Sequence, residues 1–281
     1  LKFGLIGGGS GSFIGDVHRK GEQFDDKSQL VAGCFSRSWD VTQETGTKLG
    51  IDPSRLYRSF HDMAVAEGQR SDGIDFVIIA SPNNTHFEAA KVFLENGIHV
   101  MCDKPLTHQV EESEELVRLA KERNLLLGVT YAYSQGTMVR QAREMVRRGD
   151  IGEVRVVMAE YAQGWLAEQA EASNKQAAWR TDPKLAGISN CVGDIGSHIE
   201  HIVTYITGLK IKRLCARLDA FGHDRSLDTN AHIMLEYEGG AVGSYWASQV
   251  AIGRDNSLIV RIHGTKGTIE WDQETPDLLK V

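Results

Sequence analysis

The sequence lacks the features by which membrane-bound, secreted and nucleic-acid-binding proteins are usually recognised. No apolar run approaches the roughly 18 residues that a membrane-spanning helix needs. The chain enters its first apolar strand directly, so we expect no signal peptide. The formal net charge is −7, and no basic stripe with interleaved aromatic residues is present. We therefore expect neither a membrane nor a nucleic-acid partner.

Cysteine is also scarce, and its spacing indicates no site. The chain has four cysteines, with no C-x-x-C pair and no spacing typical of metal ligands. Cys34 and Cys102 lie in or at the end of apolar strands, where a free cysteine usually packs. We expect no metal site and a reducing, cytoplasmic location.

The length of 281 residues and the order of the patterns predict two domains, because a single core rarely grows that large. Strand and helix patterns alternate to about Gly128, which predicts an α/β domain with a doubly wound parallel sheet. Beyond it, four strand-like segments run from about Lys212 to Trp271, two of them joined by a turn at 238–240. Strands without intervening helices predict an α+β domain with a mostly antiparallel sheet. The predicted domains are residues 1–130 and 131–281.

Individual elements follow from apolar runs and from helix start and stop signals. The predicted strands cover residues 29–35, 75–80, 98–102, 125–129 and 153–161, and the predicted helices cover 85–96, 110–123 and 138–148.

A glycine-rich segment follows the first apolar run, residues 3–6. It reads Gly7-Gly8-Gly9-Ser10-Gly11-Ser12-Phe13-Ile14-Gly15. A strand that ends in glycines and restarts as a helix offers backbone N–H groups to an anion, usually a pyrophosphate. Five residues rather than two separate Gly9 from Gly15, so a glycine-rich turn without a ligand is the alternative. The residues that we expect to bind a dinucleotide here are Gly7, Gly9, Ser12, Phe13 and Ile14.

The residues after the second strand bear on the choice between NAD and NADP. An acidic residue at this position binds the ribose 2′-hydroxyl of NAD, but this chain has Ser36 and Arg37. A hydroxyl and a guanidinium suit a 2′-phosphate, so the sequence favours NADP slightly over NAD. The alternative is a solvated Ser-Arg turn.

A lysine follows the strand at 98–102, in the segment Cys102-Asp103-Lys104-Pro105. Open parallel sheets present side chains to their ligand at the carboxyl ends of strands. Proline restricts the backbone, so Lys104 is held in place. An ordinary solvated lysine is the alternative.

The segment 193–201 opens a helix that runs to about Thr207 and carries two stripes. The apolar stripe consists of Ile195, Ile199, Ile202, Val203 and Ile206. The polar stripe consists of Asp194, His198, His201 and Tyr205. A carboxylate four residues before a histidine can fix its tautomer and raise its basicity, which suits a general base. The alternative is Asp194 as a helix N-cap beside a satisfied histidine.

Aromatic residues of the second domain form a further candidate group. Flat rings beside hydrogen-bonding groups suit a sugar ring, whose faces are apolar and whose edges carry hydroxyls. Core or hinge packing is the alternative for any one of them. The group consists of Tyr131, Tyr133, Trp165 and Trp179, with Arg180 next to the last.

Together these segments resemble the glucose–fructose oxidoreductase / inositol dehydrogenase (Gfo/Idh/MocA) family over essentially the whole chain. The shared marks are Gly15-x-x-His18, Ser81-Pro82-Asn83-x-x-His86, Asp103-Lys104-Pro105 and Asp194-x-Gly196-x-His198. The resemblance implies a Rossmann domain, a mostly antiparallel substrate domain, and NAD(P)-dependent oxidation or reduction at one carbon of a sugar or polyol. It implies that Lys104, Asp194 and His198 are catalytic. The residues that it adds to the cofactor site are Ser81, Pro82, Asn83, His86, Asp103 and Lys104.

The chain departs from the family pattern at three places. Asp103 stands where the family usually has glutamate, and His201 stands where many members have an aspartate. The chain also stops at Val281 without the family's closing segment. The expected substrate-binding residues are Lys104, Tyr131, Tyr133, Trp165, Arg180, Asp194, His198 and His201. The open face of the antiparallel sheet suggests a homodimer or homotetramer, as in the family.

The expected mechanism joins the two domains at a bound nicotinamide. His198 takes the proton of a substrate hydroxyl as hydride leaves the carbon, Asp194 orients His198, and Lys104 stabilises the developing alkoxide. One alternative is an NAD-dependent glycosidase that oxidises a sugar carbon transiently. The other is a non-catalytic protein that senses NAD(P) or a sugar through the same fold.

Overall fold

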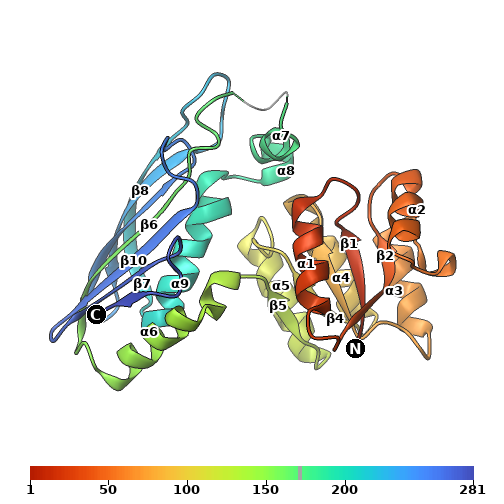
Figure 1. The fold of residues 1–281 in the computed structure, drawn as a ribbon, viewed down its shortest axis with the longest axis horizontal. Coiled ribbons are helices and arrows are strands. Elements are labelled where there is room, and N and C mark those ends of the chain that lie inside the picture. The colour runs from red at the N-terminus through yellow and green to blue at the C-terminus, as the bar shows by residue number, and fades with distance from the viewer. Residues whose placement is uncertain (170–172) are drawn as a thin grey trace. The chain divides into compact units, whose positions relative to one another are not determined.

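The chain separates after Thr130 into two units, Leu1–Thr130 and Tyr131–Val281, each with its own hydrophobic core (Figure 1). A computed structural model describes residues 1–169 and 173–281. Within these residues, every helix is too short or too polar to cross a membrane.

The first unit is built on a five-stranded parallel sheet with the order β2-β1-β3-β4-β5. Its strands are β1 (Lys2–Gly7), β2 (Gln29–Cys34), β3 (Phe76–Ala80), β4 (His99–Cys102) and β5 (Leu127–Val129). Its helices are α1 (Phe13–Gln23), α2 (Trp39–Lys48), α3 (Phe60–Gln69), α4 (His86–Glu95) and α5 (Val110–Glu122), with the short 3₁₀ turns η1 (Pro53–Arg55) and η2 (Asn83–Thr85). This is the predicted Rossmann architecture.

Helices cover both faces of this sheet because apolar side chains alternate across its strands. In β3, Val77 and Ile79 pack with residues of α3, α4 and α5, whereas Ile78 packs on the opposite face with Ile14 and Trp39. The buried cysteines Cys34 and Cys102 belong to the first of these two clusters, which confirms packing as their predicted role.

Strand register brings three predicted site segments to one edge of the sheet. Gly7 pairs with Ala80, and Ile79 pairs with Cys102. The glycine loop, the turn that begins at Ser81 and the segment that begins at Asp103 therefore all start at the carboxyl edge, where open parallel sheets bind ligands.

The second unit combines helices with a seven-stranded sheet of the order β12-β11-β10-β6-β9-β8-β7. The strands are β6 (Val154–Ala162), β7 (Ile211–Asp219), β8 (Asn230–Tyr237), β9 (Val242–Ser248), β10 (Ser257–Gly264), β11 (Thr268–Asp272) and β12 (Leu279–Lys280). All neighbours are antiparallel except β6 and β9, which run parallel. The helical elements are the 3₁₀ turn η3 (Ala132–Gln135), α6 (Thr137–Arg148), α7 (Lys175–Arg180), α8 (Pro183–Ala186), the π-helical turn η4 (Val192–Gly196) and α9 (Ser197–Thr207).

The predicted hairpin across 238–240 is confirmed as β8 and β9. The prediction of four strands between residues 212 and 271 is wrong, because the structure has five: β7 to β11. A tight turn in which the Gly264 N–H donates to the Gly267 carbonyl separates β10 from β11, and nothing in the apolar pattern marks this turn.

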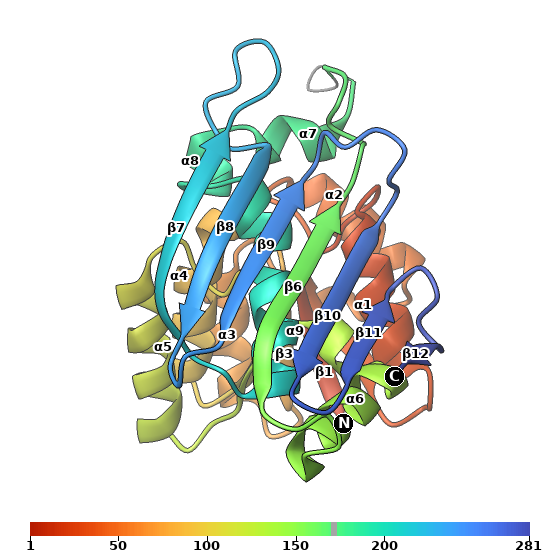
Figure 2. The ribbon, with the colours of Figure 1, turned by 90° about the vertical axis from the view of Figure 1, so that its left-hand side faces the viewer.

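One face of the second sheet packs against α6 and α9, whereas the other lies open (Figure 2). All five residues of the predicted apolar stripe of α9 and the preceding turn are buried in this core. Large apolar side chains on the open side remain exposed, among them Met158, Met234 and Val242.

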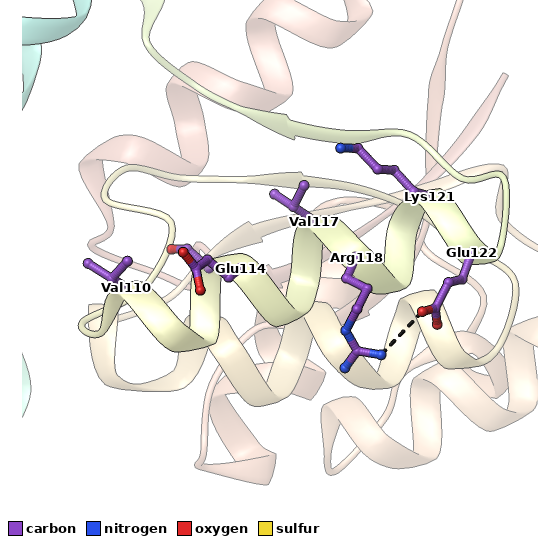
Figure 3. A pocket seen from close by; sticks show the side chains of 7 residues that line it. Val110, Glu114, Val117, Arg118, Lys121 and Glu122 are labelled. Carbon is purple, nitrogen blue, oxygen red and sulfur yellow. Dashed lines mark hydrogen bonds and ion pairs between the residues drawn. The ribbon is translucent and has the colours of Figure 1, made fainter. Parts of the chain in front are cut away.

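A shallow hollow runs along α5 on the surface of the first unit (Figure 3). Its described lining comes from α5 alone and contains no residue of the predicted site. Arg118 and Glu122 form an ion pair of 3.2 Å beside it.

Candidate active site in two halves

The glycine loop after β1 is fixed by close approaches of the backbone. Gly7 adopts a φ of 75°, and a Cβ there would lie 2.5 Å from the carbonyl oxygen of Ala80. Only glycine satisfies both conditions. Further along, the Gly9 carbonyl accepts a hydrogen bond of 2.9 Å from the Ser12 N–H, which turns the chain into α1.

The start of α1 suits the pyrophosphate of a dinucleotide. Ser12 caps the helix, because its hydroxyl accepts a hydrogen bond of 3.4 Å from the Gly15 N–H. Phe13 is 75% exposed, whereas Ile14 packs against the core. A Cβ on Gly11 would meet nothing within 4 Å, so the loop is open there. A positive helix end beside an open glycine loop is the arrangement that binds anions.

The segment between β2 and α2 holds Ser36 and Arg37. The Ser36 hydroxyl accepts from the Ser38 N–H at 3.1 Å, and the Ser36 N–H donates to Thr42 Oγ1 at 3.1 Å. Arg37 is exposed. The guanidinium carbon of Arg58 lies 4.4 Å from the centre of the ring of Trp39, the first residue of α2. A second cation, besides Arg37, therefore lies beside the start of this helix.

His86 joins two of the predicted site segments. Its ring is fully buried, with Nδ1 2.8 Å from the Pro105 carbonyl oxygen and Nε2 2.9 Å from the Ser81 carbonyl oxygen. The Ser81 and Thr85 hydroxyls lie 2.6 Å apart, and the Thr85 N–H donates to the Pro82 carbonyl. We expect His86 to act on the cofactor through the segments that it joins, because its ring has no exposed surface.

Asp103 fixes the segment that carries Lys104. Its Oδ1 accepts from the Lys104 N–H at 2.9 Å and from the Thr130 hydroxyl at 2.7 Å. The Asp103 side chain thereby ties the end of β4 to the end of β5. Burial lowers the pKa of His18, and the negative charge of Asp103 offsets part of this lowering.

In the second unit, Asp194 lies within the π-helical turn η4, so it is not the N-cap that the sequence allowed. The carboxylate of Asp228 occupies the start of this turn, where it accepts from the N–H groups of Asn190 at 2.9 Å and Val192 at 2.7 Å. A π turn inserts an extra residue into a helix and often marks a functional position. Composition and periodicity gave no sign of this turn.

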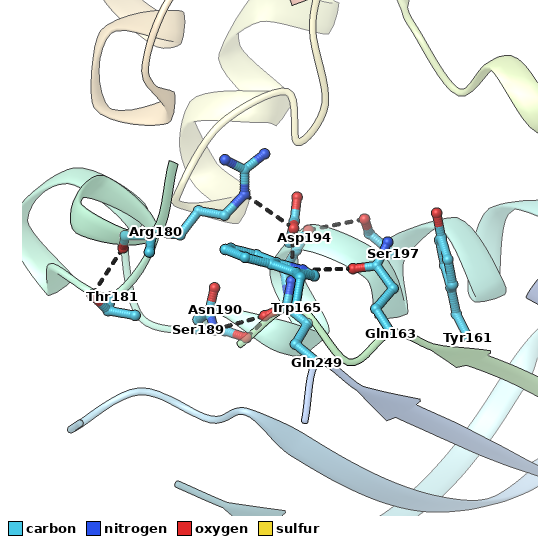
Figure 4. Close-up of polar contacts among 12 residues, drawn as sticks. Tyr161, Gln163, Trp165, Arg180, Thr181, Ser189, Asn190, Asp194, Ser197 and Gln249 are labelled. Carbon is cyan, nitrogen blue, oxygen red and sulfur yellow. Dashed lines mark hydrogen bonds and ion pairs between the residues drawn. The ribbon is translucent and has the colours of Figure 1, made fainter. Parts of the chain in front are cut away.

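The carboxylate of Asp194 receives hydrogen bonds from two other elements (Figure 4). Arg180 Nε donates to Oδ2 at 3.1 Å, and Gln249 Nε2 donates to the same oxygen at 2.8 Å. The Arg180 guanidinium also lies over the ring of Trp179, 4.3 Å from its centre. Asp194 is therefore held from α7 and from the end of β9.

His198 lies among three tyrosine rings. The centre of its ring is 5.4 Å from that of Tyr131, 4.9 Å from that of Tyr133 and 6.1 Å from that of Tyr161, each at a steep angle. His201 stacks flat on Tyr131 at 4.3 Å, and burial lowers its pKa below the ordinary value. Four predicted residues, Tyr131, Tyr133, His198 and His201, thus form one aromatic wall.

A chain of hydrogen bonds extends this wall. The Tyr133 and Tyr161 hydroxyls lie 2.7 Å apart, and Tyr161 donates to Asn256 Oδ1 at 2.6 Å. Gln163 Nε2 donates to the same Asn256 oxygen at 2.7 Å. Trp165 Nε1 donates to Gln163 Oε1 at 2.9 Å. Hydroxyls, amides and aromatic faces together match the chemistry of a sugar or polyol.

Sequence reasoning missed Gln163, Gln249 and Asn256. Gln163 and Gln249 directly follow β6 and β9, which pair in parallel with Ala162 opposite Ser248. Both amides therefore leave the sheet at the same edge. A polar residue after each buried strand was a visible signal, but the pairing of two strands so distant in sequence was not.

The structure describes the two units each by itself, so the convergence of Lys104 with His198 stays a prediction. In the described residues, no group of three or more His, Cys, Asp or Glu side chains is placed to hold a metal ion.

Comparisons with known proteins agree with the two-part architecture. Residues 1–131 match the model of the oxidoreductase family with an NAD-binding Rossmann fold, and residues 139–270 match the GFO/IDH/MocA C-terminal domain. The oxidoreductase YfiI of Bacillus subtilis, which has no characterised function, is 38% identical over 99% of this chain and 72% of its own length. Levoglucosan dehydrogenase of Pseudarthrobacter phenanthrenivorans is 31% identical over 100% of this chain and 76% of its own length.

Solved structures give the same result. An inositol dehydrogenase homolog from Azotobacter vinelandii, complexed with NAD+, has a TM-score of 0.97 and 38% identity over 99% of this chain and 72% of that chain. An inositol dehydrogenase homolog from the same organism, complexed with NADH and myo-inositol, has a TM-score of 0.93 and 36% identity over the same shares. With two family models and relatives over its whole length, this chain belongs to the Gfo/Idh/MocA family of NAD-binding oxidoreductases.

Proposed function

We propose that this protein transfers a hydride between NAD(P) and a secondary alcohol of a sugar, inositol or related polyol. The observation that carries the proposal is the wall of the second unit, where His198 is enclosed by three tyrosines and Asp194 is held in an adjoining polar network. Relatives named for levoglucosan and inositol support the substrate class.

Each catalytic residue has one task. His198 accepts the proton of the substrate hydroxyl when the alcohol is oxidised and returns it in the reverse direction. Asp194 stabilises the imidazolium that forms. Lys104 stabilises the negative charge that develops on the substrate oxygen. When bound, the nicotinamide accepts or supplies the hydride.

The cofactor site of the first unit would hold the dinucleotide by its pyrophosphate. The glycine loop and Ser12 lie at the start of α1, where backbone N–H groups meet anions. For the ribose, we propose that NADP is accepted and slightly favoured, because Ser36 and the exposed Arg37 replace an acidic residue. Because NAD is bound in the Azotobacter vinelandii structures, both cofactors need testing.

The test is a screen of inositols, monosaccharides and glycosides with each cofactor, followed by absorbance at the reduced-nicotinamide band. Net formation of NADH or NADPH from a free polyol or sugar supports the proposal. Release of an aglycone without net reduction would instead indicate the glycosidase reaction. Tight cofactor binding without turnover across the whole panel would indicate a sensor.

Lys104 provides the sharpest single-residue test of the mechanism. Lys104→Ala should lower turnover by about a hundredfold or more, because a charge that stabilises an oxyanion is lost. Affinity for the cofactor should stay nearly unchanged in a fluorescence titration. Turnover at the wild-type level in this variant would remove Lys104 from the mechanism.

We also propose that the protein forms homo-oligomers through the open face of the seven-stranded sheet. Met158, Met234 and Val242 expose apolar surface there, and extended apolar patches on a soluble protein usually mark an interface. Light scattering should give the mass of a dimer or tetramer, and Met234→Glu should shift it towards the monomer. A monomeric wild-type protein at micromolar concentration would contradict this.

A further inference from the structure

Gln249 connects the candidate catalytic aspartate to the core of the second unit. It follows β9, and its side chain has no exposed surface. One end of its amide donates to Asp194 Oδ2 at 2.8 Å, and the other accepts from Asn190 Nδ2 at 2.8 Å (Figure 4). A buried amide with both ends occupied has little freedom to turn.

The orientation of this amide follows from its neighbours. Asn190 Nδ2 also donates to the Asp228 carbonyl oxygen, so the Asn190 amide presents its N–H groups to Gln249. The oxygen of Gln249 must face this donor, which directs its NH₂ group to Asp194. The reverse orientation would place the amide oxygen of Gln249 against a carboxylate oxygen, and two acceptors repel each other.

Arg180 supplies a charge to the same carboxylate. Its Nε donates to Oδ2, the oxygen that Gln249 also contacts. The Arg180 and Asp194 side chains are only 21% and 15% exposed. Hydrogen bonds and an opposite charge both favour the ionised form of a carboxyl group. A paired guanidinium in a partly buried site is already neutralised, so it offers little attraction to an anionic substrate group.

We infer that Gln249 and Arg180 are positioning residues that hold Asp194 ionised for its partner His198, and that the site accepts uncharged sugars or polyols. The inference rests on the proposed function, because it takes Asp194 as a catalytic residue. It also assigns Arg180 to Asp194, where the sequence alone left a substrate carboxylate or phosphate open.

Other titratable groups lie near Asp194 and belong to the same pH response. Tyr161 approaches from β6, and Cys191 precedes η4. Burial raises the pKa of both groups, and the negative charge of Asp194 adds to the increase. His198 follows in the first turn of α9. None of these groups is replaced in the variants below, so a shift of the acidic limb reports on Asp194 together with His198, the base that must be neutral to accept the proton.

The first experiment replaces Gln249 with methionine, which keeps the length and removes the donor to Asp194. Asn190 Nδ2 keeps the Asp228 carbonyl as its partner. We expect kcat to fall about tenfold and the acidic limb of kcat/KM to move up by about one pH unit, with the cofactor Kd unchanged. Gln273→Met, the same change after β11, is the matched control and should move neither. An unchanged acidic limb in folded Gln249→Met would overturn the role of Gln249.

A second variant at a more exposed position covers the case in which Gln249→Met does not fold. Arg180→Gln should shift the acidic limb in the same direction, and Arg180→Lys should restore most of it by returning the charge. Wild-type enzyme should use a neutral polyol or sugar better than the matching sugar acid or sugar phosphate. A preference for the anionic substrate that disappears in Arg180→Gln would overturn the inference.

Asp194→Asn separates failure of the inference from failure of the proposed function. If Asp194→Asn keeps wild-type turnover, then the proposed catalytic role of Asp194 is wrong. If it loses turnover while both Gln249→Met and Arg180→Gln keep the wild-type pH profile, only the positioning role is wrong.

Discussion

The contact between the glycine loop and α1 gives the most direct prediction for the cofactor site. A Cβ on Gly15 would lie 2.3 Å from the Cα of Gly8, where ordinary contact begins at 3.4 Å. Backbone cannot yield as a side chain does, so Gly15→Ala must push the start of α1 away by about 1 Å. A misplacement of this size can lower a rate about a hundredfold when it moves a reacting group.

We expect Gly15→Ala to weaken NAD(P)H binding at least about tenfold, because the N–H groups at the start of α1 retreat from the pyrophosphate. The Kd is measured by titrating the fluorescence of NADH and NADPH. Circular dichroism and a thermal melt show whether the unit still folds.

Gly21 provides a matched control in the same helix. A Cβ there would meet nothing within 4 Å. Gly21→Ala should therefore stabilise α1 by up to about 1 kcal/mol, since alanine is the better helix former, and leave the Kd unchanged. Wild-type affinity in Gly15→Ala would refute the reasoning, and so would an equal loss in both variants.

Two further predictions concern histidines. His86→Leu removes a ring whose two nitrogens lie within hydrogen-bond distance of two backbone carbonyl oxygens. Leaving a buried acceptor unpaired costs about 1–3 kcal/mol, so urea unfolding should show a loss of stability of this order and a fluorescence titration should show a weaker cofactor Kd. Exposed His61→Gln should change neither. A fully stable His86→Leu would contradict this. Burial lowers the pKa of His201 in the folded protein below 6.5, its ordinary value. Between these two pKa values the unfolded chain binds more protons than the folded protein. Stability therefore falls as the pH drops through about 6.5 and levels off below the lowered pKa. Urea unfolding from pH 5 to 7.5 should show a smaller acid-side loss in His201→Gln, and an unchanged slope would count against this assignment.

Local sequence patterns predicted the five strands of the first unit and its helices α1, α4 and α5, whereas α2 and α3 were not predicted. Its strands are largely apolar, and three of them are followed directly by glycine or a polar residue at the carboxyl edge of the sheet, at Gly8, Ser81 and Asp103. Strands that follow one another in the sequence are adjacent in this sheet or are separated by one strand. Local sequence signals therefore predict most of the strand order.

The second unit was predicted less well because its site depends on distant pairing. Tyr131, Tyr133, His198 and His201 were all found by residue type and helical spacing. Gln249 was missed because its role depends on Asn190 and Asp194, which lie on other elements. The π turn at Asp194 was missed because its hydrogen bonds leave no mark on residue periodicity.

The parallel pairing of β6 with β9 has a consequence for engineering substrate range. The segment between β6 and β9, residues 164–241, includes the described helices α7, α8 and α9 and the strands β7 and β8. Strands β6 and β9 pair with each other directly through backbone hydrogen bonds. Loops within this insertion can therefore be exchanged with those of relatives while the amides of Gln163 and Gln249 keep their spacing.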